Sequence, residues 1–399
     1  MNLLYIGNWG INDSLTEATI IPHLKILSKL SNIDKIIFCS IERKTINYIT
    51  AKSLGPKIIH IPLFSSKFIF SLIKYIYDYF KFKNSLYSIV TENQIDCIIC
   101  RGSPAGIFGY IIHRHTDLPF YVESFEPHAK YMYESGVWGI FNPKYLLELF
   151  WEGKIKLFSK GLMPVSYNYR DKLILEGIDS LKIDVIPCCV SIDKFQFDQN
   201  ARNRIRQKLN IQNEITGIYV GKFGGVYYNQ KAFDIFSSIF SFFKNCFKLI
   251  IITPNNSNDV INSLIKSGIE PNNFYVNKIS HNEVPAFLSA SDFALSLYKP
   301  SISKRYLSPI KNGEYWANGL PILLTRGIGD DSKIIESEGC GATYQLKNND
   351  LNKATKQIES IIMSGTRKQV SKEISIIASR YRNFEIVEQV YNKVYNNSV

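Results

Sequence analysis

The sequence has little cysteine, and its cysteines follow no regular spacing. Seven occur in 399 residues, an odd number that argues against a disulfide framework. Cys97 and Cys100 form a C-x-x-C motif, but they lie in the apolar run DCIIC, which is typical of a strand. Residues three apart on a strand point to opposite faces, a poor geometry for a shared metal or a disulfide. We therefore expect buried free thiols, a reducing compartment and no metal site.

The sequence also lacks a long uninterrupted hydrophobic run. No apolar stretch reaches the roughly 18 to 20 uncharged residues that a transmembrane helix needs. The opening residues, MNLLYIGNWGIND, have no basic region before their short apolar run, so no secretory signal is visible. We expect a cytoplasmic protein that is either soluble or peripheral on the inner face of the cell membrane.

Acidic residues are fewer than basic ones. The chain has 35 Asp and Glu against 47 Lys and Arg, a net charge of +12, which indicates an anionic partner. Nucleic acid, an anionic membrane surface and phosphorylated substrates all qualify. The basic residues are spread along the chain and no nucleic-acid-binding motif is present, so we expect no nucleic acid partner.

Short apolar runs alternate with longer segments of helical period. The runs lie at 2–7, 35–40, 57–62, 96–100 and 118–124, and again at 216–223, 247–254, 273–279, 292–298 and 320–325. This pattern predicts an α/β protein with parallel, doubly wound sheets. The join is expected near 185–209, where an apolar strand gives way to a polar stretch. We predict domains at 1–200 and 201–375, and a helix over 376–399 that returns to the first domain.

The segment 64–90, FSSKFIFSLIKYIYDYFKFKNSLYSIV, is rich in aromatic and basic side chains. Its apolar residues share one helical face at i, i+3 and i+4 spacing: Phe68, Ile69, Leu72, Ile73, Ile76, Tyr79 and Phe80. Four lysines accompany a single aspartate, Asp78: Lys67, Lys74, Lys81 and Lys83. Such a helix suits an anionic inner-membrane surface. It equally suits an ordinary domain helix with its apolar face in the core, and both interpretations stay open.

The stretch SPIKNGEYWANGLPILLT, residues 308–325, predicts a short helix followed by a buried strand. Ser308 is a favoured N-cap, and Pro309 is tolerated at the first helical position. Gly319 and Pro321 then end the helix. We expect a helix from 309 to 318.

The beginning of this helix is a predicted anion site. Its unpaired amides and the helix dipole favour phosphate, and Lys311 places a cation in the first turn, where the dipole alone disfavours it. Glu314 follows three residues later, and a carboxylate there can accept two hydrogen bonds from a ribose diol. Phosphate and ribose together describe a nucleoside diphosphate. The alternative is a capped structural helix with a solvated Glu–Lys pair.

Several segments together resemble a known family. SPIKNGEYWANGLPILLT, followed by GIGDDSKIIESEGCGATYQL, is similar to the nucleotide-sugar half of GT-B glycosyltransferases, in particular glycosyltransferase family 4. Members of that family show an acid in a helix before A-x-G-x-P, then a G-x-G loop and a G-C-G strand. Further segments that resemble it are MPVSYNYRDKLILEGI, VIPCCVSIDKF, IYVGKFGG and HNEVPAFLSASDFALSLY. The resemblance is strongest from about residue 160 to 345.

The resemblance implies two Rossmann-like domains facing a cleft, and retaining transfer of a sugar from a nucleoside diphosphate donor without metal or cofactor. Retention in this family is described as front-face substitution, in which the leaving phosphate oxygen takes the acceptor proton. Glu314 matches the glutamate that holds the donor ribose, and Lys222 and Lys231 match basic residues that contact its phosphates. The implied donor-binding residues are Lys222, Lys231, Tyr275, Val276, Ser308, Pro309, Ile310, Lys311, Glu314, Gly327 and Gly329.

One position departs from the family pattern. Tyr306 stands eight residues before Glu314, where the E-x7-E motif has its first acid, which puts that acid's usual contact with the donor sugar in doubt.

In the first domain, VESFEPHAKYM resembles the loop that carries the family's active-site histidine. His128 is therefore the candidate, alongside Lys222 and Glu314 as catalytic residues, with Glu123 and Glu126 as its neighbours. A loop histidine bonded to backbone is the alternative for His128. Gly7 and Gly10 match the first loop facing the cleft.

We expect a hexosyltransferase-type enzyme that builds a bacterial surface polysaccharide or glycolipid, with a glycan or lipid-linked acceptor. One alternative is a nucleotide-sugar 2-epimerase of the same fold, which acts without an acceptor. The other is a catalytically silent relative that binds a partner enzyme, which the tyrosine at 306 keeps open.

Overall fold

The computed structural model describes residues 1–43, 54–67, 71–347 and 349–396, and it divides into two compact units. Unit 1 comprises Met1–Tyr133, Trp138–Cys188 and Phe384–Val399, and unit 2 comprises Glu134–Val137 and Cys189–Asn383. The division falls at Cys188/Cys189 and Asn383/Phe384, whereas the sequence placed it at 200/201 and 375/376.

Unit 1 is built on one six-stranded sheet in the order β3-β2-β1-β4-β5-β6, with every neighbouring pair parallel. The strands are β1 (Asn2–Gly7), β2 (Lys35–Glu42), β3 (Ile58–Phe64), β4 (Cys97–Arg101), β5 (Phe120–Phe125) and β6 (Gly161–Pro164). β1 and β2 are buried along almost their whole length. That burial explains why they are nearly continuous apolar runs rather than alternating ones.

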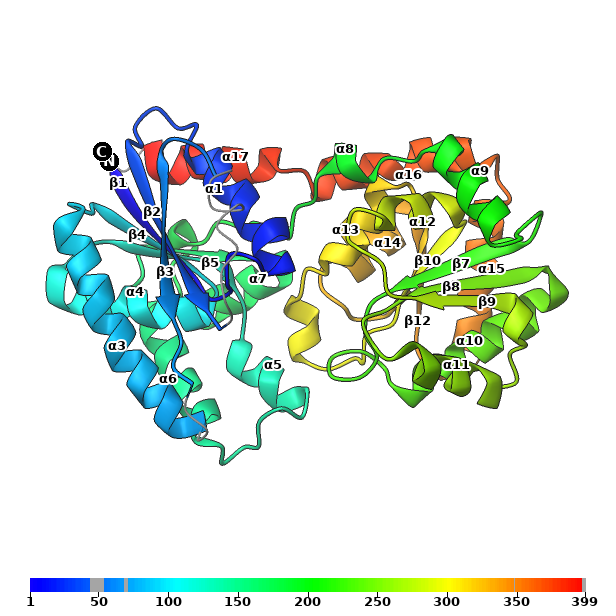
Figure 1. Ribbon diagram of the computed structural model, residues 1–399, viewed down its shortest axis with the longest axis horizontal. Coiled ribbons are helices and arrows are strands. Elements are labelled where there is room, and N and C mark those ends of the chain that lie inside the picture. Colours follow the sequence, from blue (N-terminus) through cyan, green and yellow to red (C-terminus); the bar gives the residue numbers. More distant parts are fainter. Residues whose placement is uncertain (44–53, 68–70, 348, 397–399) are drawn as a thin grey trace. The chain divides into compact units, whose positions relative to one another are not determined.

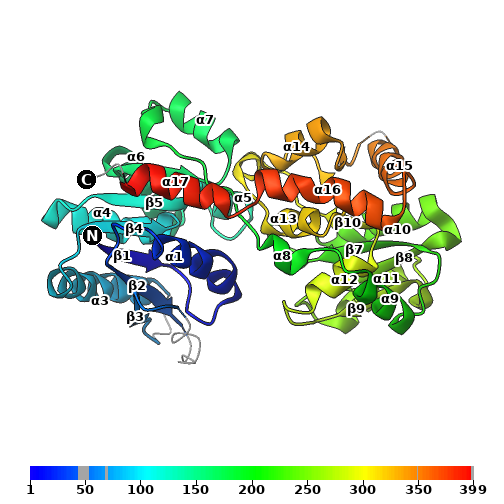
Figure 2. The same cartoon turned by 90° about the horizontal axis from the view of Figure 1, so that it is seen from above.

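Helices cover both faces of this sheet (Figure 1). α1 (Ile21–Leu27) and the C-terminal α17 (Glu385–Asn396) lie on one face and pack together. α3 (Ser71–Glu92), α4 (Ser103–Thr116) and α6 (Pro143–Phe158) form the other layer, with α4 in contact with both of its neighbours (Figure 2). The shorter helices α5 (His128–Glu134) and α7 (Tyr167–Leu175) follow β5 and β6. The return of a C-terminal helix to the first unit is thus confirmed for α17, whereas residues 376–383 of the helix predicted over 376–399 belong to unit 2.

Unit 2 repeats the topology, with a parallel sheet in the order β12-β11-β10-β7-β8-β9. Its strands are β7 (Ile215–Val220), β8 (Phe247–Ile252), β9 (Phe274–Asn277), β10 (Phe293–Ser296), β11 (Ile322–Thr325) and β12 (Gly341–Tyr344). Ile218 and Val220 pack into the core on one face of the sheet and Tyr219 into the core on the other. This alternation follows from the two-residue period of a strand.

The helices of unit 2 divide between these two cores. α9 (Gln199–Lys208), α12 (Val284–Ala290), α13 (Ile310–Ala317), α14 (Asp331–Glu338) and α16 (Arg367–Tyr381) contribute to the first. α10 (Gln230–Phe243), α11 (Ser257–Lys266) and α15 (Asp350–Ile362) contribute to the second. The short α8 (Ile192–Phe195) precedes α9. The α/β class with two doubly wound sheets, predicted from the sequence, is therefore confirmed.

One predicted strand is wrong. Residues 185–189 adopt no regular structure, although the amide of Ile186 donates to the carbonyl of Pro164 at the end of β6. Pro187 interrupts any continued ladder because proline has no backbone N–H. The segment therefore runs beside β6 without extending the sheet.

The seven cysteines are all free thiols, and five of them are buried. Burial raises the pKa of the Cys97 thiol on β4 to about 12. Within the described residues, no cluster of three or more His, Cys, Asp or Glu side chains is arranged to hold a metal ion. Among the described helices, none is both long and apolar enough to cross a membrane.

Candidate functional site

The predicted donor helix is present as α13, but it begins one residue later than expected. Its N-cap is Pro309 rather than Ser308, and no side chain caps it. The hydroxyl of Ser308 instead accepts a hydrogen bond from Nη1 of Arg382, so it is not free to cap the helix. No acceptor for the amides of Ile310 and Lys311 is found among the described residues. The first turn therefore presents two open donors together with the positive end of the helix dipole.

A buried polar network holds α13 in place. Asn312 donates from Nδ2 to Oδ2 of Asp331 at 2.7 Å and accepts at Oδ1 from the hydroxyl of Ser296, also at 2.7 Å. The other oxygen of Asp331 forms an ion pair with Arg382, and both side chains are almost completely buried. The network joins α13 to the end of β10, to the start of α14 and to the residue after α16. Buried ionic groups need such partners because desolvation is costly.

Glu314 is the buried centre of the site. Only 2% of its side chain is exposed, and both carboxylate oxygens have partners. Lys311 Nζ lies 2.8 Å from Oε2, and His281 Nε2 lies 3.0 Å from Oε1. Burial would raise the pKa of Glu314, but Lys311 and the hydrogen bond from His281 outweigh it and hold the pKa below its usual value. Glu314 is therefore an ionised, oriented acceptor, and the solvated Glu–Lys pair considered as its alternative is wrong.

Close packing determines the other residues of the motif: Gly313, Tyr315 and Gly319. A Cβ on Gly313 would lie 3.0 Å from Val190 Cγ1 and 3.2 Å from Arg382 Cγ. Gly319 has φ of +72°, and a Cβ there would meet the Ser371 carbonyl at 2.3 Å, so it ends the helix as predicted. The Tyr315 hydroxyl accepts the amide of Val220 at 3.1 Å. This bond ties α13 to the end of β7, two residues before Lys222.

Lys222 and Lys231 lie on the loop after β7 and in the first turn of α10, and both are exposed. The loop packs on the segment after β10, because the amide of Tyr228 donates to Leu297 and that of Lys299 to Val226. β7 and β10 are neighbours from which the chain winds in opposite directions. Ligands of doubly wound sheets bind at such a switch point, outside the carboxyl ends of the strands.

In the turn at 327–329 after β11, the backbone amides donate hydrogen bonds to other residues of the chain. Gly327 and Ile328 both donate from their amides to the hydroxyl of Ser332 at 3.0 Å, and the amide of Gly329 donates to the Lys304 carbonyl at 2.9 Å. A Cβ on Gly329 would lie 2.1 Å from the Leu307 carbonyl oxygen. The turn therefore holds the segment before α13 close to α14.

Tyr275 and Val276 lie within β9, the edge strand next to β8. The Tyr275 ring stacks on Phe287 with centroids 5.7 Å apart, and its hydroxyl accepts from Asn277 at 2.7 Å. His281, which holds Glu314, follows four residues after the end of β9. Tyr306, which replaces the first acid of the motif, is the last residue of a short 3-10 helix (Ser303–Tyr306).

In unit 1, Gly7 is the last residue of β1, and Gly10 lies in the loop that follows it. A Cβ on Gly10 would lie 2.4 Å from Oε2 of Glu42, and the amide of Ile11 donates to Oε1 of the same carboxylate at 2.7 Å. Glycine at position 10 thus allows the loop to close over the buried Glu42.

His128 and Glu126 follow β5, at the same carboxyl edge of the sheet as Gly10. His128 begins α5, and its ring lies edge-on to that of Trp138 at 5.7 Å. Burial lowers the pKa of His128 to about 4, so the imidazole is neutral at pH 7. Its backbone amide donates to the Glu126 carbonyl at 2.8 Å. Glu152 on α6 accepts the amide of Ala129 at 2.8 Å and so fixes the first turn of α5.

Glu123, predicted as a neighbour of His128, lies in a different environment. It is completely buried, and its Oε2 accepts from the Tyr5 hydroxyl at 2.9 Å and pairs with Arg101 at 3.2 Å. The hydroxyl of Tyr391 on α17 donates to its other oxygen. Between Glu123 and the loop stands Ser124, whose φ of +50° and local register shift turn the chain toward Glu126.

Sequence reasoning missed His281, Asp331 and Arg382. Asp331 lies 19 residues from its partner Asn312, and Arg382 lies 74 residues from its partner Ser308. His281 and Asp331 did fall within segments that resemble the family, HNEVPAFLSASDFALSLY and GIGDDSKIIESEGCGATYQL, but the pattern assigns neither of them a role.

Comparisons with known proteins show likeness in structure alone. No family model and no curated protein matches the sequence. HepE of Anabaena in complex with UDP-glucose is similar with a TM-score of 0.73 and 12% identity, over 100% of both chains. WaaG, a glycosyltransferase involved in lipopolysaccharide biosynthesis, gives a TM-score of 0.68 at 13% identity, over 99% of this chain and 100% of that one. The UDP-GlcNAc 2-epimerase of Neisseria meningitidis gives 0.62 at 13%, over 100% of both. With two parallel Rossmann-like sheets matched along the whole chain, this protein has the GT-B fold.

Proposed function

We propose that this protein is a retaining glycosyltransferase that uses a nucleoside diphosphate sugar and a lipid-linked glycan acceptor in bacterial surface polysaccharide synthesis. The observation that carries the proposal is α13: two open amides and Lys311 at its start, with the ionised, buried Glu314 one turn later. Structural neighbours with the same fold bind UDP or UDP-glucose, which supports a nucleotide-sugar donor.

Donor binding requires an exchange of partners at Glu314, because Lys311 and His281 now cover it. The donor diphosphate draws the Lys311 ammonium to itself, and the ribose hydroxyls replace that ammonium on the carboxylate. One charge-assisted pair is thereby converted into two contacts with the donor. The ion pair keeps the carboxylate ionised and oriented until the donor arrives.

The same groups then act on the leaving diphosphate. Negative charge builds on it as the sugar departs, and Lys222, Lys231, Lys311 and the α13 dipole stabilise that charge without reorganisation. The leaving phosphate oxygen takes the acceptor proton, so the scheme needs neither a separate protein base nor a metal ion. Neutral His128 supplies a hydrogen-bonding group for an uncharged sugar hydroxyl.

Replacing Glu314 tests this proposal. Glu314→Ala is expected to lower donor turnover, measured as nucleoside diphosphate release, by at least about 100-fold, in line with loss of a key charged contact. Glu373→Ala, an exposed acid on α16, is the matched control and should retain full turnover. If Glu314→Ala keeps the turnover of the control, the assignment of the donor site is wrong.

The surface of α3 supports a membrane-bound acceptor. Ile73, Ile76 and Phe80 are 54%, 50% and 57% exposed, whereas the core contacts of α3 come from Phe82, Leu86, Ile89 and Val90. Of the apolar face predicted from the sequence, Ile73, Ile76 and Phe80 therefore do not pack into the core, whereas Tyr79 is half-buried against Phe108. Phe68, Ile69 and the side chain of Leu72 lie outside what the structure describes. Exposed apolar side chains beside Lys74 and Lys81 fit the interface of an anionic bilayer.

Vesicle binding tests the membrane part. Converting Lys74, Lys81 and Lys83 to Glu is expected to reduce sedimentation with anionic vesicles, since each basic residue contributes about 1 kcal/mol near such a surface. Neutral vesicles serve as the control surface. Unchanged binding to anionic vesicles would remove the membrane from the proposal.

A 2-epimerase is the second candidate, and the likeness to the Neisseria enzyme is the observation that favours it. An epimerase converts a nucleotide sugar without any acceptor. Incubating the protein with UDP-GlcNAc alone and recording the proton NMR spectrum separates the two candidates: the 2-epimer appears for an epimerase, and only slow hydrolysis appears for a transferase.

A further inference from the structure

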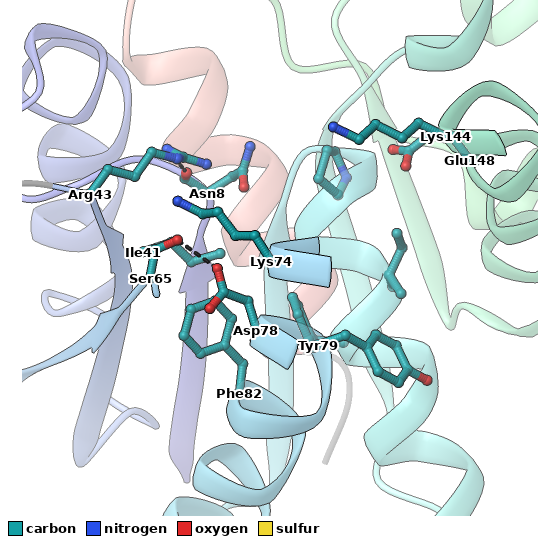
Figure 3. A pocket seen from close by; sticks show the side chains of 13 residues that line it. Asn8, Ile41, Arg43, Ser65, Lys74, Asp78, Tyr79, Phe82, Lys144 and Glu148 are labelled. Carbon is teal, nitrogen blue, oxygen red and sulfur yellow. Dashed lines mark hydrogen bonds between the residues drawn. The ribbon is translucent and has the colours of Figure 1, made fainter. Parts of the chain in front are cut away.

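Unit 1 contains a pocket of about 310 Å³ that the donor site does not use. It lies where the ends of β1, β2 and β3 meet the layer of α3, α4 and α6 (Figure 3). Its volume is at the lower end of the range for small-molecule sites.

Three cations line the pocket, and of these Lys74 also acts electrostatically on Asp78, one helical turn away. Arg43 follows β2, Lys74 lies on α3 and Lys144 on α6, and within the described part of the chain none of the three forms an ion pair. Figure 3 shows the ends of Arg43 and Lys74 on one side of the pocket, with the Lys144 side chain extending toward them. The one ionised acid in the lining, Asp78, is held by the Ser65 hydroxyl at 2.6 Å and the Ser66 amide at 2.8 Å. The pocket therefore carries excess positive charge.

Glu148 adds a buried carboxyl group to the lining of the pocket. It lines the pocket, only 5% of it is exposed, and Oε1 has no hydrogen-bond partner among the described residues. Burial, with a smaller contribution from Glu152, raises the pKa of Glu148 to about 8, so the carboxyl is mostly protonated at pH 7. A protonated carboxyl can donate to an anionic oxygen and does not cancel the three cations.

The rest of the lining is apolar. Phe82, Ile107 and Phe108 form its wall together with the ring of Tyr79. Exposed apolar residues continue from it along the two flanking helices: Ile73, Ile76 and Phe80 on α3, and Leu146, Leu147 and Phe150 on α6. A ligand bound here meets cations at one end and hydrocarbon at the other.

We infer that this pocket binds a phosphate group attached to an apolar chain, with the phosphate held by Arg43, Lys74 and Lys144 and the first carbons of the chain lying against Phe82 and Phe108. A sugar phosphate leaves the apolar wall without a partner, and a neutral glycolipid leaves the cations without one, whereas an anionic amphiphile satisfies both. A phosphate group fits three cations better than a carboxylate does, because it offers more oxygens and carries up to two charges. Within the proposed function, on which this identification rests, that ligand is the lipid phosphate part of the acceptor.

Calorimetric titration of the full chain with decyl phosphate, below its critical micelle concentration, tests the inference. Wild-type protein is expected to bind it, and the double variant Lys74→Ala/Lys144→Ala to bind at least about tenfold more weakly, the equivalent of 1.4 kcal/mol. Lys25→Ala, an exposed lysine on α1, is the control and should bind as wild type does. Equal affinity in the double variant would overturn the inference.

Two further arms separate the sources of phosphate and the two proposals. Inorganic phosphate is expected to bind at least about tenfold more weakly than decyl phosphate, and equal affinity would mean a free-phosphate site and overturn the amphiphile. The double variant should keep the far-UV circular dichroism spectrum and the thermal midpoint of wild type, which shows that it is folded. Decyl phosphate binding that persists when no nucleotide sugar is turned over would leave the pocket standing and remove the proposed function alone.

Discussion

Each unit contains a buried arginine paired with a carboxylate, but the two pairs stabilise different parts of the structure. In unit 1, Arg101 and Glu123 join neighbouring central strands, and Tyr391 and His23 bring α17 and α1 onto the same carboxylate. In unit 2, Arg382 and Asp331 lie beneath α13, where Ser308 and Asn312 complete the network. The same interaction secures a returning helix in one unit and the candidate site in the other. Breaking each pair should therefore have like effects on stability and unlike effects on activity.

Removing one carboxylate from each pair gives the largest expected effect. Asp331→Ala and Glu123→Ala each leave an arginine buried without its partner, which costs about 3–5 kcal/mol of unfolding free energy. Urea denaturation measures this, with Glu373→Ala as the control. Where the variants remain folded, Asp331→Ala should also lose donor turnover and Glu123→Ala should retain it. The comparison fails if both variants, still folded, lose turnover equally.

Unit 1 is expected to lose stability as the pH rises, because of Glu148. The pKa of Glu148, about 8 in the folded protein, exceeds its ordinary value of 4.5, so the native state binds the proton more tightly than the unfolded state does. The contribution of Glu148 to the free energy of unfolding is therefore complete below about pH 4.5. It falls by about 1.4 kcal/mol per pH unit as the pH rises from there toward 8.

Glu148→Gln should reduce this fall in the free energy of unfolding, because an amide does not ionise. Urea denaturation at pH 6 and pH 8 is expected to show a fall in wild type that is about 1–3 kcal/mol larger than in the variant. Glu388→Gln, an exposed acid on α17, should behave as wild type. Parallel pH profiles for wild type and Glu148→Gln would show that the carboxyl is ionised in the folded protein.

The carboxylate of Glu123 should give the stability of the same unit the opposite pH dependence. Burial alone would raise its pKa, but His23 and Arg101 lower it to about 2. The stability it contributes is present above its ordinary value of 4.5 and is lost as pH falls toward 2. Acid unfolding followed by circular dichroism should therefore shift to higher pH in Tyr391→Phe, which removes a hydrogen bond that lowers the pKa of Glu123 and adds no group that titrates in acid. An unchanged acid midpoint would contradict the role of Tyr391.

The smallest expected effect is in unit 2. His281→Ala removes one of the two partners of Glu314 while Lys311 remains, so the donor KM is expected to rise by about tenfold or less. His281→Gln, which retains a donor, should restore much of the loss, and kcat should change little in either variant. A fall in kcat of the size expected for Glu314→Ala would instead place His281 among the catalytic residues.

The sequence predicts local elements well and long-range partners poorly. Buried strands such as β2 and β8 are short apolar runs, so the sequence pattern indicates them. The end of α13 is also indicated, because the glycine that follows the helix must adopt a positive φ. β6 has only four residues, Gly161–Pro164, too few to show a period. The displacement of Ser308 from the cap depends on Arg382, and the neutral state of Glu148 depends on burial by helices far along the chain. Neither leaves a local pattern.

Turnover of nucleotide sugars by the purified protein tests the central claim most directly. The panel contains UDP-, GDP-, ADP- and CMP-sugars, with release of the nucleotide and the anomeric configuration of the product followed by NMR. We predict turnover of at least one diphosphate donor with retained configuration, and none of the CMP-sugars, because a monophosphate cannot occupy both the α13 amides and Lys222. Absence of both binding and turnover for every diphosphate sugar would contradict the account and leave a catalytically silent protein with a glycosyltransferase fold.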